Sequence, residues 1–280
     1  MSLIAIVGAG ALGGTLAHRL AARGRVNEVR LIDEQASVAQ GKALDIQQSG
    51  AVEGFSTRLT SAGAIEAAAG ADAIVVADTS RGDAEHTGEP GLALVKRLAS
   101  IDSSAPLIFA GASQRLLLAR AASELRVPPR RLIGSAPGAL ESAVRALAGL
   151  EADASGVEVQ LRVVGVPPDA AVVAWEEASA FGQPISTVVT PHRLAAISAR
   201  VPRLWPPGTG VLASAAARAA EALTNGSRRR YSCFVVIEEG SLVRVLAMPV
   251  ELGRGGVARV LRPALTRQEQ TRLDNASAIN

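Results

Sequence analysis

The sequence predicts an α/β fold with two domains, and three observations support this fold class. Its 280 residues are enough for two medium-sized hydrophobic cores. Up to about residue 135, short apolar runs alternate with stretches of helical periodicity, which is typical of a parallel sheet with crossover helices. From residue 136 the order changes to one helix followed by groups of strands, which indicates an α+β domain. We therefore predict domains at residues 1–135 and 136–280.

The first domain is predicted to alternate strands with helices throughout. The strands are expected at 3–7, 28–33, 57–60, 72–77, 106–110 and 131–134. The helices are expected between them, at 11–23, 36–48, 61–69, 90–100 and 112–125. Because crossover helices join the strands, the strands are expected to run parallel.

The second domain is predicted to mix both element types. Helices are expected at 139–149 and 210–224, and strands at 157–165, in pieces of 171–189, and at 231–238, 242–251 and 257–262. A further helix begins at Thr190-Pro191, with threonine as N-cap and proline in the first turn. The last helix begins at Thr266, where Glu269 three residues later completes a capping box.

A glycine-rich turn follows the first strand. Gly8, Gly10 and Gly13 stand directly after the apolar run 3–7. In such a turn the first glycine permits the tight bend, the second removes a Cβ that would block a pyrophosphate, and the third lets the helix pack closely on the strand. Asp33 ends the second apolar run, 20 positions after Gly13. These features predict a Rossmann dinucleotide-binding domain; the alternative is a Rossmann fold whose site is empty or reused.

The predicted cofactor is NAD. The helix after the turn offers free N–H groups and a partial positive charge to phosphates. Asp33 can accept hydrogen bonds from a ribose, and its charge would repel a 2′-phosphate, which favours NAD over NADP. Asp78 lies where a cofactor-side glycine is usual, and its charge would weaken pyrophosphate binding. The expected cofactor-binding residues are Gly8, Gly10, Ala11, Leu12, Gly13, Asp33 and Asp78.

The composition limits the classes of partner. The 29 Lys and Arg residues are nearly balanced by 26 Asp and Glu residues, the arginines are scattered apart from 228–230, and only 2% of residues are aromatic. We therefore predict no nucleic-acid partner. No membrane span is predicted, because no apolar stretch reaches about 18 residues. Cys233 is the one cysteine and is expected to be a buried thiol in a cytoplasmic protein without a signal peptide or a metal site.

Several segments resemble the malate/lactate dehydrogenase family over nearly the whole chain. They are Gly8–Gly13, Asp33, Gly41–Ile46, Leu140–Ala143, Met248–Val257 and Leu265–Glu269. The resemblance implies an NAD-binding Rossmann domain, the family's α+β catalytic domain, and association into a homodimer or homotetramer through helices that include 41–48. It also implies a mechanism in which a histidine, paired with an aspartate, exchanges a proton with the substrate while hydride passes to or from the nicotinamide. Arginines and an asparagine hold the substrate.

Pro167 occupies the position of the catalytic histidine. The family's Gly-Glu-His-Gly-Asp segment here reads Gly165-Val166-Pro167-Pro168-Asp169. Proline has no titratable group and offers no side-chain hydrogen bond. The remaining histidines are His18, His86 and His192. Only His86 is on a loop that could approach the site, and a solvated loop histidine is the alternative.

The helix predicted at 139–149 carries two further departures from the family. Glu141 stands where the family has aspartate, so the carboxylate is one methylene further from the backbone. Val144 stands where the family has the arginine that holds the substrate carboxylate, and valine cannot make that two-pronged contact. Arg145 is adjacent, but one residue along a helix rotates a side chain by about 100°.

The loop at 81–91 is acidic, although the corresponding loop in the family carries substrate-binding arginines. Arg81 matches the first of these arginines, and Gly91 stands in place of the second. Three acids against one arginine give the loop a formal charge of −2 with His86 neutral, which would repel an anionic oxoacid. Gly111-Ala112 replaces the family's asparagine-proline pair.

Three functional hypotheses remain open. The first is a family member that binds NAD but is inactive on 2-hydroxy and 2-oxo acids, with a regulatory or structural role. It could associate with itself or with an active relative. The second is an active NAD-dependent oxidoreductase with a changed substrate and proton donor, such as Glu141, His86 or water. The third is an ordinary malate or lactate dehydrogenase whose catalytic residues align elsewhere. The positions that decide between them are Arg81, Glu141, Val144, Pro167 and Asp169.

Overall fold

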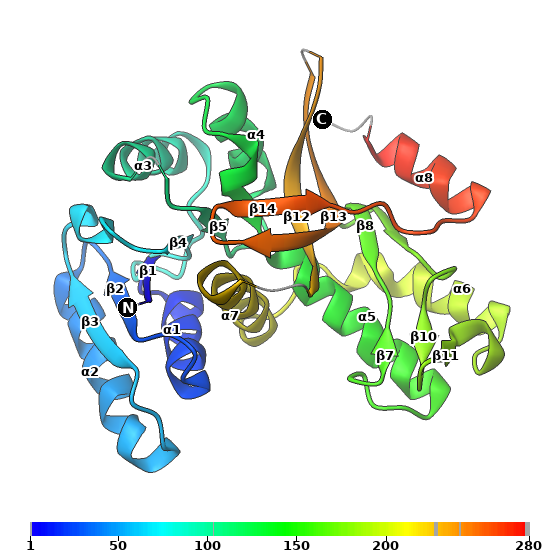
Figure 1. Cartoon of the computed structure of the whole chain (residues 1–280), viewed down its shortest axis with the longest axis horizontal. Coiled ribbons are helices and arrows are strands. Elements are labelled where there is room, and N and C mark those ends of the chain that lie inside the picture. The colour runs from blue at the N-terminus through cyan, green and yellow to red at the C-terminus, as the bar shows by residue number, and fades with distance from the viewer. Residues whose placement is uncertain (1, 103, 227–228, 241, 278–280) are drawn as a thin grey trace.

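The computed structural model describes residues 2–102, 104–226, 229–240 and 242–277, so Arg228 of the arginine run lies outside the described residues. An 11-stranded sheet runs through the molecule (Figure 1). Its main path has the order β3-β2-β1-β4-β5-β6-β12-β13-β8-β9, and β14 pairs with β13. The strands are β1 (Leu3–Val7), β2 (Glu28–Ile32), β3 (Arg58–Ala62), β4 (Ala73–Val76), β5 (Leu107–Phe109), β6 (Leu132–Gly134), β8 (Val163–Val166), β9 (Ala170–Val173), β12 (Arg230–Glu239), β13 (Leu242–Gly253) and β14 (Gly256–Val260).

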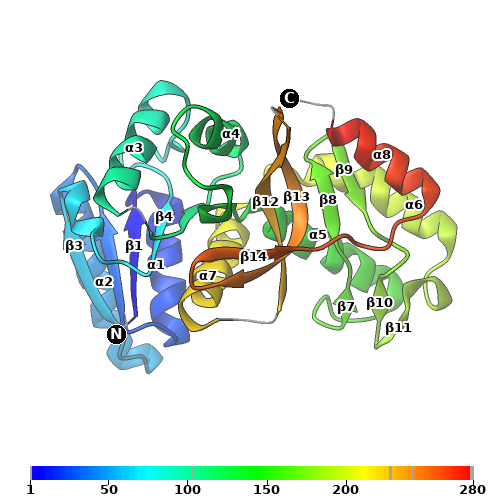
Figure 2. The same ribbon diagram turned by 45° about the horizontal axis from the view of Figure 1, so that its top comes forward.

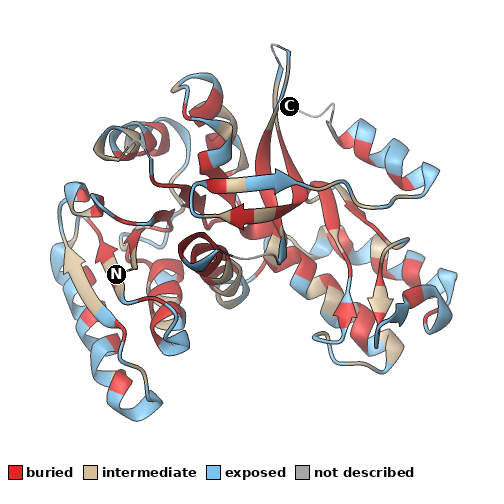
Figure 3. Ribbon diagram, viewed as in Figure 1, coloured by how far each residue is buried: buried red, intermediate tan, exposed pale blue. Residues whose placement is uncertain are grey.

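The first six strands form a parallel Rossmann sheet, as the alternating pattern predicted. β1 pairs in parallel with both β2 and β4, so the chain winds outward in two directions from the centre. β1 and β4 are almost wholly buried because helices cover both faces, which explains their continuous apolar sequences (Figure 3). The α-helices are α1 (Ala11–Arg23), α2 (Ala36–Glu53), α3 (Gly88–Ile101), α4 (Arg115–Ser123), α5 (Ala136–Ala152), α6 (Pro191–Arg200), α7 (Thr209–Asn225) and α8 (Arg267–Ser277).

The sheet continues across the predicted domain boundary. β12 pairs antiparallel with β6, and β13 then joins β12 to β8. α7 packs beside α1 on the Rossmann side, although it comes late in the sequence (Figure 2). A separate small sheet, formed by β7 (Val159–Gln160), β10 (Ser179–Ala180) and β11 (Gln183–Pro184), lies beside α5. The division at 135/136 stays a prediction, and the backbone hydrogen bonds show one sheet spanning it.

Most predicted elements are confirmed, and one is wrong. The helix predicted at 61–69 is instead the end of β3, which runs to Ala62, followed by a 3₁₀ turn at Ile65–Ala68. The cause is tertiary, because pairing of Ile32 with Ala62 draws this segment into the sheet. The capping box of α8 is confirmed: the Thr266 N–H donates to Glu269 Oε2 at 2.8 Å, and the Glu269 N–H donates to Thr266 Oγ1 at 3.2 Å.

Candidate functional site

The glycine turn brings β1, α1 and the segment after β4 into close contact. Gly8 has φ of 110°, and a Cβ there would lie 2.2 Å from the Asp78 carbonyl oxygen. A Cβ on Gly13 would lie 1.9 Å from the Gly8 carbonyl oxygen. At Gly10 the added Cβ would lie 2.4 Å from Cγ of Asp78. The first and third glycines are therefore required by backbone packing, and the second leaves room for both the Asp78 side chain and the Thr79 carbonyl oxygen.

The amide groups at the start of α1 are bound by carboxylates of the chain itself. The N–H groups of Leu12 and Gly13 each donate to Asp78, at 2.8 Å. The Ala11 N–H donates to Asp83 at 2.7 Å. A helix N-terminus is a favourable place for negative charge, because its unpaired N–H groups point outward and its dipole is positive there. Here Asp78, which is 3% exposed, supplies that charge.

Asp33 is likewise satisfied within the protein. Its carboxylate accepts hydrogen bonds from the N–H groups of Ala9 (2.8 Å), Gln35 (2.9 Å) and Ser80 (3.0 Å), and from Ser80 Oγ (2.6 Å). Burial alone would raise the pKa of Asp33, but these hydrogen bonds outweigh it and the pKa is lowered. A carboxylate has about four acceptor sites, so this conformation leaves none for ribose hydroxyls. Asp33 lies directly after β2, beside the glycine turn, and its role toward a ribose stays a prediction. The sequence did not indicate Ser80 as its partner.

Glu85, which follows Asp78 and Asp83 in the chain, binds the turn between β5 and α4. Glu85 accepts hydrogen bonds from the N–H groups of Ala112 (2.9 Å) and Ser113 (2.7 Å). A Cβ on Gly111 would lie 2.3 Å from the Glu85 carboxyl carbon, so a larger residue at 111 would displace this contact. The place where the resemblance implied a substrate-binding asparagine is thus filled by Glu85.

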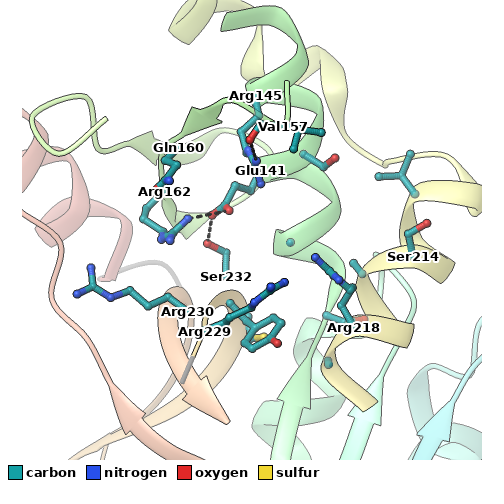
Figure 4. A pocket seen from close by; sticks show the side chains of 18 residues that line it. Glu141, Arg145, Val157, Gln160, Arg162, Ser214, Arg218, Arg229, Arg230 and Ser232 are labelled. Atoms are coloured by element: carbon teal, nitrogen blue, oxygen red, sulfur yellow. Dashed lines mark hydrogen bonds and ion pairs between the residues drawn. The ribbon is translucent and has the colours of Figure 1, made fainter. Parts of the chain in front are cut away.

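Glu141 is buried and faces Arg162 and Ser232 (Figure 4). Its Oε1 lies 3.1 Å from Arg162 Nη1, and its other oxygen accepts a hydrogen bond from the Ser232 hydroxyl. Burial raises the pKa of Glu141, and the attraction of Arg162 and the Ser232 hydrogen bond only partly offset this. The partners of this carboxylate are thus Arg162 and Ser232, neither of them at the expected histidine position.

The other positions implied by the resemblance lie in different surroundings. Val144 is 0% exposed and packs in the apolar cluster around α5 and the small sheet. Pro167 is buried, whereas Asp169 and Arg81 are exposed. Within the described parts of the chain, none of these residues forms a hydrogen bond or ion pair with Glu141 or with another of the set.

A cavity of about 650 Å³ lies between α5, α7 and the start of β12 (Figure 4). Glu141 opens onto it, and its polar lining is mainly Arg145, Arg162, Arg218, Arg229 and Arg230. Arg145 shares this lining with Glu141 because positions four apart lie on one helix face, whereas Val144 points into the core. Sequence reasoning missed the cavity, since its arginines are far apart in the chain; only the 141/145 spacing signalled it.

The three histidines and the cysteine lie in different surroundings. His18 pairs with Glu53 at 2.8 Å, and His192 is exposed in the first turn of α6. His86 is half-buried, burial lowers its pKa, and its Nε2 has no hydrogen-bond partner among the described residues. The free thiol of Cys233 is buried, as predicted, and burial raises its pKa.

Comparison with known proteins gives consistent results. Residues 2–105 match the family model described as lactate/malate dehydrogenase, NAD binding domain. The malate dehydrogenase of Roseiflexus sp. is 29% identical over 290 residues, which covers 95% of this chain and 92% of that protein. The malate dehydrogenase of Thermomicrobium roseum is 28% identical over 301 residues, covering 98% and 94%.

Solved structures show the same fold. The malate dehydrogenase of Salinibacter ruber superposes with a TM-score of 0.86 at 23% identity, covering 99% of this chain and 94% of that one. The Cryptosporidium parvum lactate dehydrogenase, solved with lactic acid and NAD, gives a TM-score of 0.86 at 20% identity, covering 98% and 94%. Residues 2–105 thus match the NAD-binding domain of the lactate/malate dehydrogenase family, and the chain is similar to malate dehydrogenases over nearly its whole length. The match to this domain supports NAD as the cofactor.

The residues of this chain do not accommodate the NAD pyrophosphate in the conformation described. The fold provides the glycine turn and the start of α1, but Asp78 and Asp83 already accept hydrogen bonds from the amides of Ala11, Leu12 and Gly13.

Among the residues that the structure describes, no helix is long and apolar enough to cross a membrane. Within the same residues, no cluster of His, Cys, Asp or Glu is suited to a metal ion.

Proposed function

We propose that this malate/lactate dehydrogenase-like protein does not turn over 2-hydroxy or 2-oxo acids and has a regulatory or structural role. The observation that carries the proposal is the surroundings of two side chains on α5. Its acid, Glu141, is bound to Arg162 and Ser232, and Val144 lies in an apolar cluster. Val144 has no guanidinium to bind a substrate carboxylate, and Pro167 cannot exchange a proton.

Magnitudes support inactivity rather than a slowed enzyme. Loss of one general acid or base commonly costs a factor of about 10² to 10⁴. Here the proton-transfer group and the carboxylate-binding group are both replaced, and the loop that should bind the oxoacid is acidic. We expect these losses together to bring turnover of this reaction below detection.

The test is a direct assay of hydride transfer. NADH oxidation would be followed with oxaloacetate and pyruvate, and NAD reduction with malate and lactate, over a range of pH. The Roseiflexus sp. malate dehydrogenase serves as the positive control. We expect no turnover above background. Turnover of about one per second, at the low end of ordinary enzymes, would refute the proposal.

A second candidate is an active oxidoreductase of the same class with another substrate. It is favoured by two observations: Glu141 opens onto the arginine-lined cavity, and burial raises the pKa of this carboxyl, so it retains a proton to higher pH. Such a site suits an anionic substrate. If a panel of hydroxy acids yields an activity, Glu141→Gln should abolish it, whereas Glu151→Gln on the exposed end of α5 should not.

We propose a cytoplasmic location and an assembly with a second copy or with an active relative. The location is supported by the free, buried Cys233, which requires no oxidising compartment. The assembly is supported by the resemblance, which implies contact through α2. A heteromer would give a silent subunit a regulatory role.

A further inference from the structure

Segment 78–85 is hydrogen-bonded both to the start of α1 and to the turn between β5 and α4. Asp78 and Asp83 bind the first amides of α1, and Glu85 binds the β5–α4 turn. The segment is also closed on itself, since the Thr79 N–H donates to the Ala84 carbonyl at 2.9 Å and Asp78 forms a β-bridge with Glu85. It is therefore a compact loop, tied at two points by its own carboxylates.

These contacts use the groups that a dinucleotide would use. The fingerprint glycines exist to let a pyrophosphate approach the amides at the start of α1. Each amide has one hydrogen, which donates fully to one acceptor, and those of Leu12 and Gly13 are held by Asp78. A buried carboxylate beside a pyrophosphate also adds repulsion between like charges. The two anions cannot occupy this place together.

The ribose-binding group is engaged through the same segment. Ser80 donates two hydrogen bonds to Asp33, through its N–H at 3.0 Å and its Oγ at 2.6 Å. Withdrawal of residues 78–85 would therefore free both the amides of α1 and two acceptor positions on Asp33. A single withdrawal of this segment would therefore free the groups that bind the phosphates and the group that binds the ribose.

We propose that segment 78–85 is an internal competitor for the dinucleotide, with the Asp78 carboxylate in the place of the pyrophosphate. NAD then binds only when this segment withdraws from α1. The proposal concerns binding alone and is independent of the proposed lack of turnover.

The segment has the means to move. Gly82, in the middle of the segment, has φ of 77°, and Gly88, three residues after its end, has φ of 59°, a region in which glycine is unstrained. Residues 81–84 are exposed, so their withdrawal costs little apolar burial. His86 Nε2 is buried without a partner among the described residues, a cost that opening would relieve.

The test measures NADH affinity by fluorescence titration of the full chain. Asp78→Gly removes the competing carboxylate, and Asp78→Asn removes its charge while keeping its size. We expect both variants to bind NADH at least about tenfold more tightly than the wild type. Asp102→Asn is the matched control, because Asp102 also accepts backbone N–H groups, from Ser104 and Ala105, but lies outside the segment. It should leave the affinity unchanged.

A second measurement follows the segment itself. Hydrogen exchange of the wild type should become faster in residues 78–88 when NADH is added, and Asp78→Asn should show faster exchange there without NADH. The proposal is overturned if both Asp78 variants bind NADH no more than about twofold tighter than the wild type. It is equally overturned if exchange in 78–88 does not respond, or if neither variant binds at about 1 mM.

Discussion

The Glu141 carboxylate lies 3.1 Å from the Arg162 guanidinium, and this ion pair is almost enclosed by protein. The resemblance implied that the acid at this position would support a histidine across the cleft. Its partner is instead an arginine one residue before β8, and Ser232 from β12 completes the contact. The pair thus joins α5 to the two neighbouring strands and has a structural role.

Removal of Arg162 should destabilise the protein strongly. Arg162→Ala leaves the buried Glu141 without its cation, and breaking a buried pair from one side costs about 3 kcal/mol. Chemical denaturation at pH 7 measures the change in the free energy of unfolding. Arg193→Ala is the control, since its pair with Glu151 is exposed and should contribute less than about 1 kcal/mol. Equal effects of the two variants would contradict the structural role.

Asp33 should make stability depend on pH in the acid range. Its pKa is lowered in the folded state, so its contribution is present above the ordinary, unfolded-state pKa of 3.8 and is lost as the pH falls through the folded-state pKa. Asp33→Asn should therefore be less stable than the wild type at pH 7, by about 2 kcal/mol. The difference should shrink toward pH 3. Thermal unfolding at several pH values measures it, and a difference independent of pH would contradict the explanation.

The sequence predicted the fold well because periodicity and fingerprint agree along the first half. The helix at 11–23 matches α1 at both ends, since Gly10 and Gly24 border a regular apolar face. The failure at 61–69 has a tertiary cause, because so short a segment gains little from helix formation alone and its first residues pair with β2 instead.

The candidate site was predictable only in part. The sequence showed that Asp78 brings negative charge to the glycine turn. It did not show that the carboxylate turns onto the amides of Leu12 and Gly13, because that depends on the path of residues 79–84. The arginine-lined cavity was missed for the same reason, as its residues meet only after folding.

An arginine at position 144 should disrupt the protein rather than repair its chemistry. The family resemblance suggests that restoring dehydrogenase activity would need at least Pro167→His, Val144→Arg and Gly91→Arg together. However, Val144 is 0% exposed in an apolar cluster, so a guanidinium there would be buried without a partner. We expect Val144→Arg to lower the free energy of unfolding by more than about 3 kcal/mol.

The matched control lies on the same helix. Leu150 is 80% exposed, so Leu150→Arg should change stability by less than about 0.5 kcal/mol. Pro167→His alone should leave the protein inactive on malate and lactate. A stable Val144→Arg variant would show that position 144 does not point into the core. Robust turnover by Pro167→His alone would contradict the argument that activity needs the missing arginines.

Self-association should depend on the exposed side of α2. This helix lies at the outer edge of the molecule, beside the edge strand β3 (Figure 1). Of the apolar residues in 41–48, Ala43 and Ile46 are buried in their own chain, and Leu44 is 56% exposed. Leu44 is therefore the residue available to a second copy, and a charge there would be buried without a partner in the interface.

Light scattering coupled to size-exclusion chromatography measures the outcome. We expect the wild type to elute as a dimer or tetramer, and Leu44→Glu to weaken association at least about tenfold, because an unpaired buried charge costs more than 1.4 kcal/mol. Val52→Glu is the control, since Val52 is 88% exposed on the same helix but outside 41–48. A wild-type monomer at high concentration would exclude the homo-oligomer, and equal behaviour of the two variants would place the interface away from Leu44.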